Sequence, residues 1–199
     1  MADKKKRRGR RAYLNDYKLG EDGQYRYTGV QYRLRGKLPK RQVLLSLWIP
    51  AAVLIAATLG SACIPAAAMF GAFGALPFIG EVAAGGSAIW ALAKLTPSVE
   101  RPYEHVYKAT VERLPRRAVV TAIFAGVGLC GCVLHTLLYG FAGTLWWTLL
   151  LWLTKAGQAA SALWLRRNLK KLEWRPRKSA AAKTAESVSE DTGEAEEQR

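Results

Sequence analysis

The stretch VLLSLWIPAAVLIAATLGSACIPAAAMF, residues 43–70, carries no charged side chain. A transmembrane helix needs about 20 consecutive, predominantly apolar residues, so this stretch is long enough for one crossing and the start of a turn. Its apolar residues form one continuous block. They do not alternate with polar residues, as in a half-buried strand, or recur every three to four residues, as in an amphipathic helix. The block therefore predicts a membrane-spanning helix.

Three further apolar stretches follow it in the chain. Residues 73–93 contain one charged side chain, Glu81, and residues 143–165 contain only Lys155. The turn YGFAG, residues 139–143, separates the last two stretches because two glycines around an aromatic residue break a helix. The sequence thus predicts an all-α integral membrane protein with four transmembrane helices in two helical hairpins. The expected spans are about 43–65, 73–94, 118–139 and 143–165.

The apolar stretches also allow other interpretations. The main competing interpretation makes the chain from Thr154 onward a helix that lies in the membrane interface. A cleavable secretory signal is not expected, because a polar region of 42 residues precedes the first span. The motif LGSAC, residues 59–63, resembles a lipoprotein cleavage box, but its leucine stands one place too far from Cys63.

The positive charge is concentrated outside the apolar stretches. The formal net charge is +15, and most Lys and Arg residues lie before, between and after the two hairpins, with none in the connections near 64–72 and 139–143. Under the positive-inside rule the basic regions are cytoplasmic, and so are the N- and C-termini. Compactness and the missing signal favour a bacterial plasma membrane. The predicted organisation is a basic N-terminal segment 1–42, hairpin 43–95, loop 96–117, hairpin 118–166 and a basic, then acidic, disordered tail 167–199.

The run KKKRRGRR, residues 4–11, is the most basic part of the chain. Next to a transmembrane span, such a run binds anionic lipid headgroups. Each Lys or Arg near the membrane surface contributes about 1 kcal/mol to the binding free energy. Nucleic acid is a weaker interpretation, because a basic run alone carries no base readout. The expected lipid contacts are Lys4, Lys5, Lys6, Arg7, Arg8, Arg10 and Arg11.

Two cytoplasmic segments are candidate docking sites for a protein partner. In residues 16–36 the turn signal GEDG lies between stretches in which Tyr and Leu alternate with basic residues. This pattern predicts a small β-hairpin, which would be only marginally stable by itself. A disordered basic linker is the alternative. Residues 102–114 place their apolar side chains on one stripe, which predicts an amphipathic helix. The expected docking residues are Tyr25, Tyr27, Tyr32, Tyr103, Val106 and Tyr107.

Glu81 and Lys155 are the two strongest candidates for functional ionisable groups inside the predicted spans. On each helix, small or polar residues share the face of the charged residue, which indicates that both charges point into the bundle. The depths of the two residues in the membrane allow them to form an ion pair. His135 lies nearer the outer surface as a further polar group. One hypothesis is a proton or small-ion pathway through these residues. The other, which we favour, is a structural pair that fixes helix register, because no polar path continues to the inner side.

No catalytic or cofactor chemistry is predicted. Cys63, Cys130 and Cys132 match neither a disulfide framework nor a zinc spacing. The motif GVGLCG, residues 126–131, follows no strand, so it is not read as a dinucleotide-binding loop. The two histidines, His105 and His135, are expected on opposite sides of the membrane, which leaves no nucleophile with a base. The chain is therefore not expected to be an enzyme or to bind a metal or cofactor.

Two functions remain open on the sequence. In the first, the protein is a non-catalytic subunit or scaffold of a membrane complex that docks a partner through its cytoplasmic segments. In the second, it is a small homo-oligomeric proton- or ion-coupled transporter or channel that uses Glu81 and Lys155. Four short spans rarely enclose a substrate cavity, so transport would require self-association.

Overall fold

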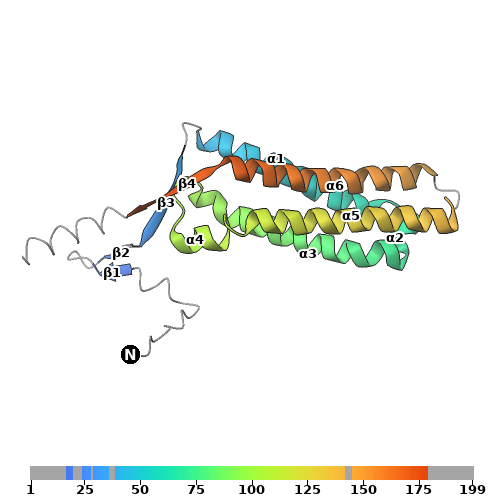
Figure 1. Cartoon of the computed structure of the whole chain (residues 1–199), viewed down its shortest axis with the longest axis horizontal. Helices are drawn as coiled ribbons and strands as arrows, with labels where there is room; N and C mark the ends of the chain where they lie inside the picture. The colour runs from blue at the N-terminus through green and yellow to red at the C-terminus, as the bar shows by residue number, and fades with distance from the viewer. Residues whose placement is uncertain (1–16, 20–23, 28, 36–38, 142–144, 179–199) are drawn as a thin grey trace, which may run out of the picture.

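Four long helices lie side by side along one axis (Figure 1). The computed structural model describes residues 17–19, 24–27, 29–35, 39–141 and 145–178. Short helices lie in two of the connections between the long ones. The long helices are α1 (Lys40–Cys63), α3 (Ala72–Leu95), α5 (Leu114–Tyr139) and α6 (Leu145–Lys171), and the short ones are α2 (Ala67–Phe70), α4 (Glu104–Ala109) and the 3-10 turn η2 (Thr96–Ser98).

The helices pack in the order α3, α5, α6, α1. Extensive contacts join α3 to α5, α5 to α6 and α6 to α1, whereas α1 touches α3 far less. Near the end of the bundle where α1 begins, Leu47 lies in the main hydrophobic core with Leu92 and Leu95 of α3. All four long helices contribute buried residues to the bundle interior.

In the part of the chain that the structure describes, three stretches are long and apolar enough to cross a membrane: Lys40–Cys63, Ala72–Ser98 and Glu104–Tyr139. Helix α6 is longer than α1 but is not among them. Its inward face carries Lys155 and Gln158, which lower its mean hydropathy. The expected helix boundaries near 43–65, 73–94 and 118–139 agree with the structure to within a few residues.

Helix α5 ends at the predicted turn. The backbone of Gly140 has φ of 72°, a left-handed conformation that glycine adopts without steric cost. Its N–H donates to the carbonyl of Thr136 at 2.8 Å and so closes the last turn of α5. Residues 142–144 of the predicted turn lie outside the described residues.

The predicted helix over residues 102–114 is much shorter than expected. Helix α4 ends at Ala109, a turn follows, and Leu114 already begins α5. Pro115 explains the break, because its ring would clash with the carbonyl of Val111 in a continuous helix, whereas proline suits the first turn of a new one.

The predicted N-terminal hairpin is present as two short strands. Strand β1 (Tyr17–Leu19) pairs antiparallel with β2 (Tyr25–Tyr27); residues 20–23 of the turn between them lie outside the described residues. A second ribbon was not predicted. Strand β3 (Val30–Arg35) pairs antiparallel with β4 (Glu173–Lys178).

Strand β4 corrects the prediction of a disordered tail over 167–199. The chain continues as α6 to Lys171 and then forms β4 up to Lys178. Trp174 orders this strand, because its ring packs against the main core and its indole N–H donates to the carbonyl of Val99 at 3.2 Å. Residues 179–199 lie outside the described residues.

The ribbon of β3 and β4 is closed on one edge and blocked on the other. On the β3 edge, Tyr32 and Leu34 donate their N–H groups to the carbonyls of Pro102 and Glu100, at 3.0 and 3.1 Å. In the antiparallel register Pro176 opposes Tyr32, so its nitrogen faces the outer edge of β4, where proline offers no N–H. Addition of another strand there is therefore disfavoured. We call β1–β4 together with residues 99–109 the terminal platform.

Helices α1 and α6 are joined by a hydrogen bond that compensates for a proline. Pro50 lies inside α1 and has no N–H for the carbonyl of Ser46, four residues earlier. The side-chain amide of Asn168 on α6 donates to that carbonyl at 2.6 Å. The free backbone group of one helix is thus satisfied by a side chain of its neighbour.

Replacing Asn168 by Ala should therefore lower the free energy of unfolding by about 1–2 kcal/mol, because a part-buried carbonyl loses its donor. In a Pro50→Ala background, the backbone N–H at position 50 can bond Ser46 instead, and the same substitution should cost less than about 0.5 kcal/mol. A double-mutant cycle of unfolding free energies in detergent measures this coupling. Equal costs in both backgrounds would contradict the role given to Asn168.

Candidate functional site

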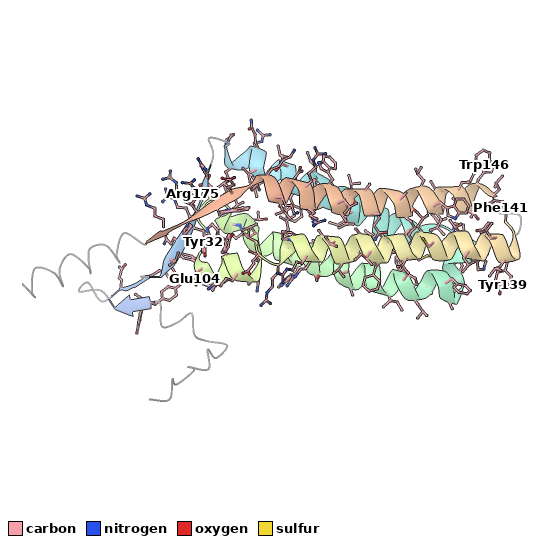
Figure 2. All side chains as sticks on the ribbon, viewed as in Figure 1. Tyr32, Glu104, Tyr139, Phe141, Trp146 and Arg175 are labelled. Carbon is pink, nitrogen blue, oxygen red and sulfur yellow. The ribbon has the colours of Figure 1, made fainter. Side chains whose placement is uncertain are left out.

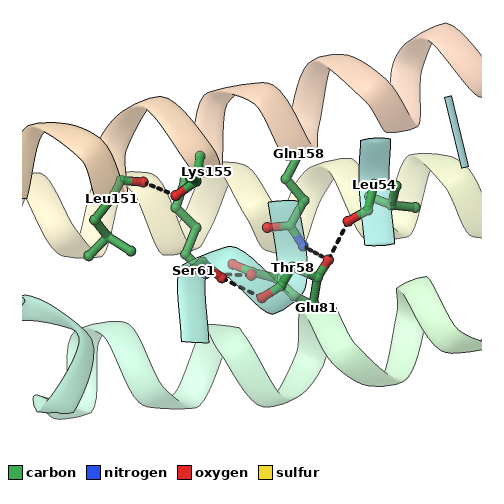
Figure 3. Close-up of polar contacts among 8 residues, drawn as sticks. Leu54, Thr58, Ser61, Glu81, Leu151, Lys155 and Gln158 are labelled. Atoms are coloured by element: carbon green, nitrogen blue, oxygen red, sulfur yellow. Dashed lines mark hydrogen bonds and ion pairs between the residues drawn. The ribbon is translucent and has the colours of Figure 1, made fainter. Parts of the chain in front are cut away.

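A cluster of polar side chains lies inside the helical bundle (Figure 3). We call it the buried polar cluster. It draws on three helices, and its members are Thr58 and Ser61 on α1, Glu81 on α3, and Lys155 and Gln158 on α6.

Glu81 and Lys155 form an ion pair at the centre of this cluster. Lys155 Nζ donates to Glu81 Oε2 at 2.5 Å, and both side chains are 0% exposed. Lys155 Nζ also lies 4.9 Å from the centre of the Phe78 ring, within range of a cation–π contact. Each charge is thus neutralised inside a single chain. The structure brings together the two residues that the sequence places on inward faces.

Small residues around Glu81 make room for the pair. On α3, Gly74, Gly85 and Ala88 are buried on the same face as Glu81. From α5, Gly128 packs directly against the carboxylate, and a Cβ at this position would overlap Oε1 of Glu81. The glycines that the sequence marks as packing surface therefore bring α3 and α5 close enough to enclose the charge.

Gln158 extends the cluster toward α1. Its side-chain N–H donates to Thr58 Oγ1 at 2.9 Å, and the hydroxyls of Thr58 and Ser61 donate to backbone carbonyls of α1. Among the described residues, Glu81 Oε1 and Gln158 Oε1 are buried without a hydrogen-bond partner. The cluster holds one carboxylate, one amine, one amide and two hydroxyls, a set that can fix helix register.

His135 lies apart from the buried polar cluster. It is half-buried on α5, its ring is 4.9 Å from that of Tyr139, and it packs against Gly71. Gly128 is the position on α5 that touches Glu81, and His135 stands seven residues further on, about 10 Å along the helix. The polar descent from His135 to Lys155 that the sequence suggested is not continuous in the contacts described.

The cysteines are dispersed. Cys63 and Cys130 are exposed, and Cys132 is buried in the second core cluster. Within the described part of the chain, no group of three or more His, Cys, Asp or Glu side chains could hold a metal ion.

The predicted docking tyrosines pack mainly on one another. Tyr32 stacks on Tyr107 with ring centres 3.8 Å apart, and Tyr27 meets Tyr103 edge-on at 4.8 Å. The two segments expected to dock a partner therefore bind each other within one chain. Only Tyr25 stands largely free, with 74% of its surface exposed.

Tyr107 is the titratable group of the terminal platform with a clear perturbation. Burial raises the pKa of its phenol above the ordinary value, and the neighbouring Tyr32 and Glu112 raise it further. Val106 is half-buried in α4 beside it, and its carbonyl accepts the hydroxyl of Thr110. The stacked tyrosine therefore remains a neutral packing residue at physiological pH.

Some members of these sites were missed by the sequence analysis or cannot be placed. Thr58 was missed, although its helical position faces α6, and Trp174 was missed because it falls in the predicted tail. The expected lipid contacts within residues 4–11 lie outside the described residues.

Comparisons with known proteins add no relative. The chain matches no protein-family model, no curated protein and no solved structure. What the molecule does must therefore be argued from its own residues.

Proposed function

We propose that this chain is a four-span integral membrane protein that acts as a non-catalytic subunit or scaffold of a membrane complex. In this proposal all four long helices cross the bilayer, and the terminal platform faces the cytoplasm. The platform then presents a folded surface to a protein partner.

The observation that carries the proposal is the apolar exterior of the bundle. Its interior contains an ion pair and an amide, while large apolar side chains stand exposed along all four long helices. In water such a surface would be far larger than the apolar patches of soluble monomers; in lipid it is the expected exterior. Examples of exposed side chains are Leu45, Ile49, Leu76, Ile79, Trp90, Ile123, Val127, Leu137, Leu153 and Trp164.

The two ends of the bundle differ as the ends of a membrane protein do. Tyr139, Phe141 and Trp146 gather at one end, whereas Tyr32, Glu104 and Arg175 mark the other (Figure 2). Aromatic side chains favour the membrane interface, and positive charge favours the cytoplasmic side. This asymmetry supports a cytoplasmic terminal platform.

Placing α6 across the membrane is supported by the way it buries its charge. Lys155 and Gln158 face inward, while Leu149, Leu153 and Trp164 face outward. A charge costs little in a bilayer only when it is paired inside the bundle. The same complete burial favours a structural ion pair over an ion pathway.

Cysteine accessibility in intact cells tests the topology. In a variant with Cys63, Cys130 and Cys132 changed to Ala, we expect a membrane-impermeant maleimide to label Tyr139→Cys in intact cells. Lys171→Cys, at the other end of α6, should react only after the membrane is permeabilised. Reaction of both sites in intact cells would place α6 in the interface and overturn the four-span proposal.

Photocrosslinking tests the scaffold role separately. A photoreactive amino acid at Tyr25, which is more exposed than Tyr103 of the same terminal platform, should give one discrete adduct with a second protein in the native host. The same amino acid at Tyr139, at the opposite end, serves as the matched control and should not give that adduct. Adducts only between copies of this chain would favour a homo-oligomer and count against a scaffold.

A further inference from the structure

One face of the ribbon formed by β3 and β4 is rich in arginine. Directly opposite residues of an antiparallel pair share a face, and so do residues two apart in one strand. The register pairs Arg33 with Arg175, Gln31 with Arg177 and Arg35 with Glu173, so all six side chains lie together. We call this surface the arginine face.

The arginine face points away from the rest of the molecule. Tyr32, Leu34 and Trp174 occupy the other side of the ribbon, where they pack against Tyr107 and the main core. Every charged side chain on the arginine face is exposed, and Arg175 can be located in Figure 2.

Most of this charge lacks a counter-ion among the described residues. Arg35 pairs with Glu173 at 3.3 Å, but Arg33, Arg175 and Arg177 make no ion pair there. Arg33 and Arg175 also stand directly across the ribbon from each other. Like charges in that position destabilise a sheet, so the ribbon would be stabilised by a ligand that supplies several negative charges.

The chain itself contains such a ligand a short distance after β4. Residues 184–198 contain no Lys or Arg, although the chain as a whole is strongly basic. They hold Glu186, Glu190, Asp191, Glu194, Glu196 and Glu197.

The acidic residues are close enough along the chain to reach the arginine face. Strand β4 ends at Lys178, and the eight residues from there to Glu186 span at most about 29 Å. The six-residue ribbon is about 20 Å long. A segment tethered at this range is present at an effective concentration in the millimolar range, which favours it over a free anion.

We propose that the acidic segment 186–197 folds back onto the arginine face and that its carboxylates bind Arg33, Arg175 and Arg177. Guanidinium groups hold carboxylates through paired, charge-assisted hydrogen bonds, which suits this surface. The segment thereby covers a strongly positive surface of the terminal platform. This inference does not depend on the protein's place in a membrane complex.

Distances between spin labels in the full-length protein test the proposal. With the three native cysteines changed to Ala, labels are attached at Lys171→Cys and Ser189→Cys. Folding back along the ribbon brings position 189 near the start of β4. Changing Arg33, Arg175 and Arg177 together to Gln should release the segment, lengthen the mean label distance by about 10 Å and broaden its distribution.

Matched variants decide the outcome. Changing Arg113, Arg116 and Arg167 to Gln removes the same charge from exposed positions off the ribbon and should leave the distance unchanged. The proposal is overturned if the arginine-face variant has the wild-type distance, or if neutralising residues 4–11 alone releases the segment. Circular dichroism checks that each variant is folded, which the exposure of these arginines leads us to expect.

Discussion

Replacing Lys155 by Met while Glu81 is kept should lower the free energy of unfolding by about 3–5 kcal/mol. The substitution leaves a carboxylate that is 0% exposed, with Lys155 Nζ gone as its partner and no hydrogen-bond partner for Oε1 among the described residues. Titration with SDS of the protein in mild-detergent micelles measures the loss. Ala156→Met, which adds a side chain at an exposed neighbouring position of α6, is the control and should change stability little.

The double variant Glu81→Gln, Lys155→Met separates the net contribution of the ion pair to stability from the cost of leaving one buried charge unpaired. Removing both charges leaves no uncompensated ion, so we expect it to be considerably more stable than Lys155→Met alone. If the double variant also retained its crosslinking partner, the pair would serve structure only. A double variant no more stable than Lys155→Met would contradict this account of the cluster.

Gly131→Ala should have an effect of similar size, about 3 kcal/mol, through sterics alone. Pro77 leaves the carbonyl of Phe73 without its usual helical donor, and Gly131 of α5 packs against that oxygen. A Cβ at position 131 would overlap this backbone oxygen. Backbone cannot rotate aside as a flexible side chain can, so α3 and α5 would have to separate.

Gly126 provides a matched control on the same helix. A Cβ at this position meets nothing within 4 Å, so Gly126→Ala should leave stability unchanged or raise it by up to about 1 kcal/mol through helix propensity. The changes in unfolding free energy measured for the two alanine variants should therefore have opposite signs or very different sizes. Equal behaviour would show that the close approach of α3 and α5 at Gly131 is not important for stability.

Much of the helical core could be predicted because the apolar blocks mark it directly. The boundaries of α1, α3 and α5 follow from long runs without charge, and the inward direction of Glu81 and Lys155 follows from the small residues on their helix faces. Both signals are local in the sequence. They depend on helical periodicity and on the cost of burying a charge.

The terminal platform could not be predicted in the same way. Strand β3 alternates apolar and polar residues, but β4 has Trp174 as its one large apolar residue and so lacks the alternation that marks a strand. In addition, 138 residues separate Arg35 from Glu173, so nothing local in the sequence indicates that the two strands pair. Tyr27, Tyr32 and Tyr107 were predicted to bind a partner because the sequence cannot distinguish an aromatic residue that packs within the chain from one that waits for another protein. The break after α4 was predictable in principle from Pro115.

The pairing of β3 with β4 has a consequence for biosynthesis. Strand β3 is made early, but its partner is not translated until all four long helices have been synthesised. At 5–20 residues per second, the interval between the two strands is on the order of ten seconds. During that time β3 lacks the strand with which it pairs in the folded chain, so the ribbon can close only after α6 has been made.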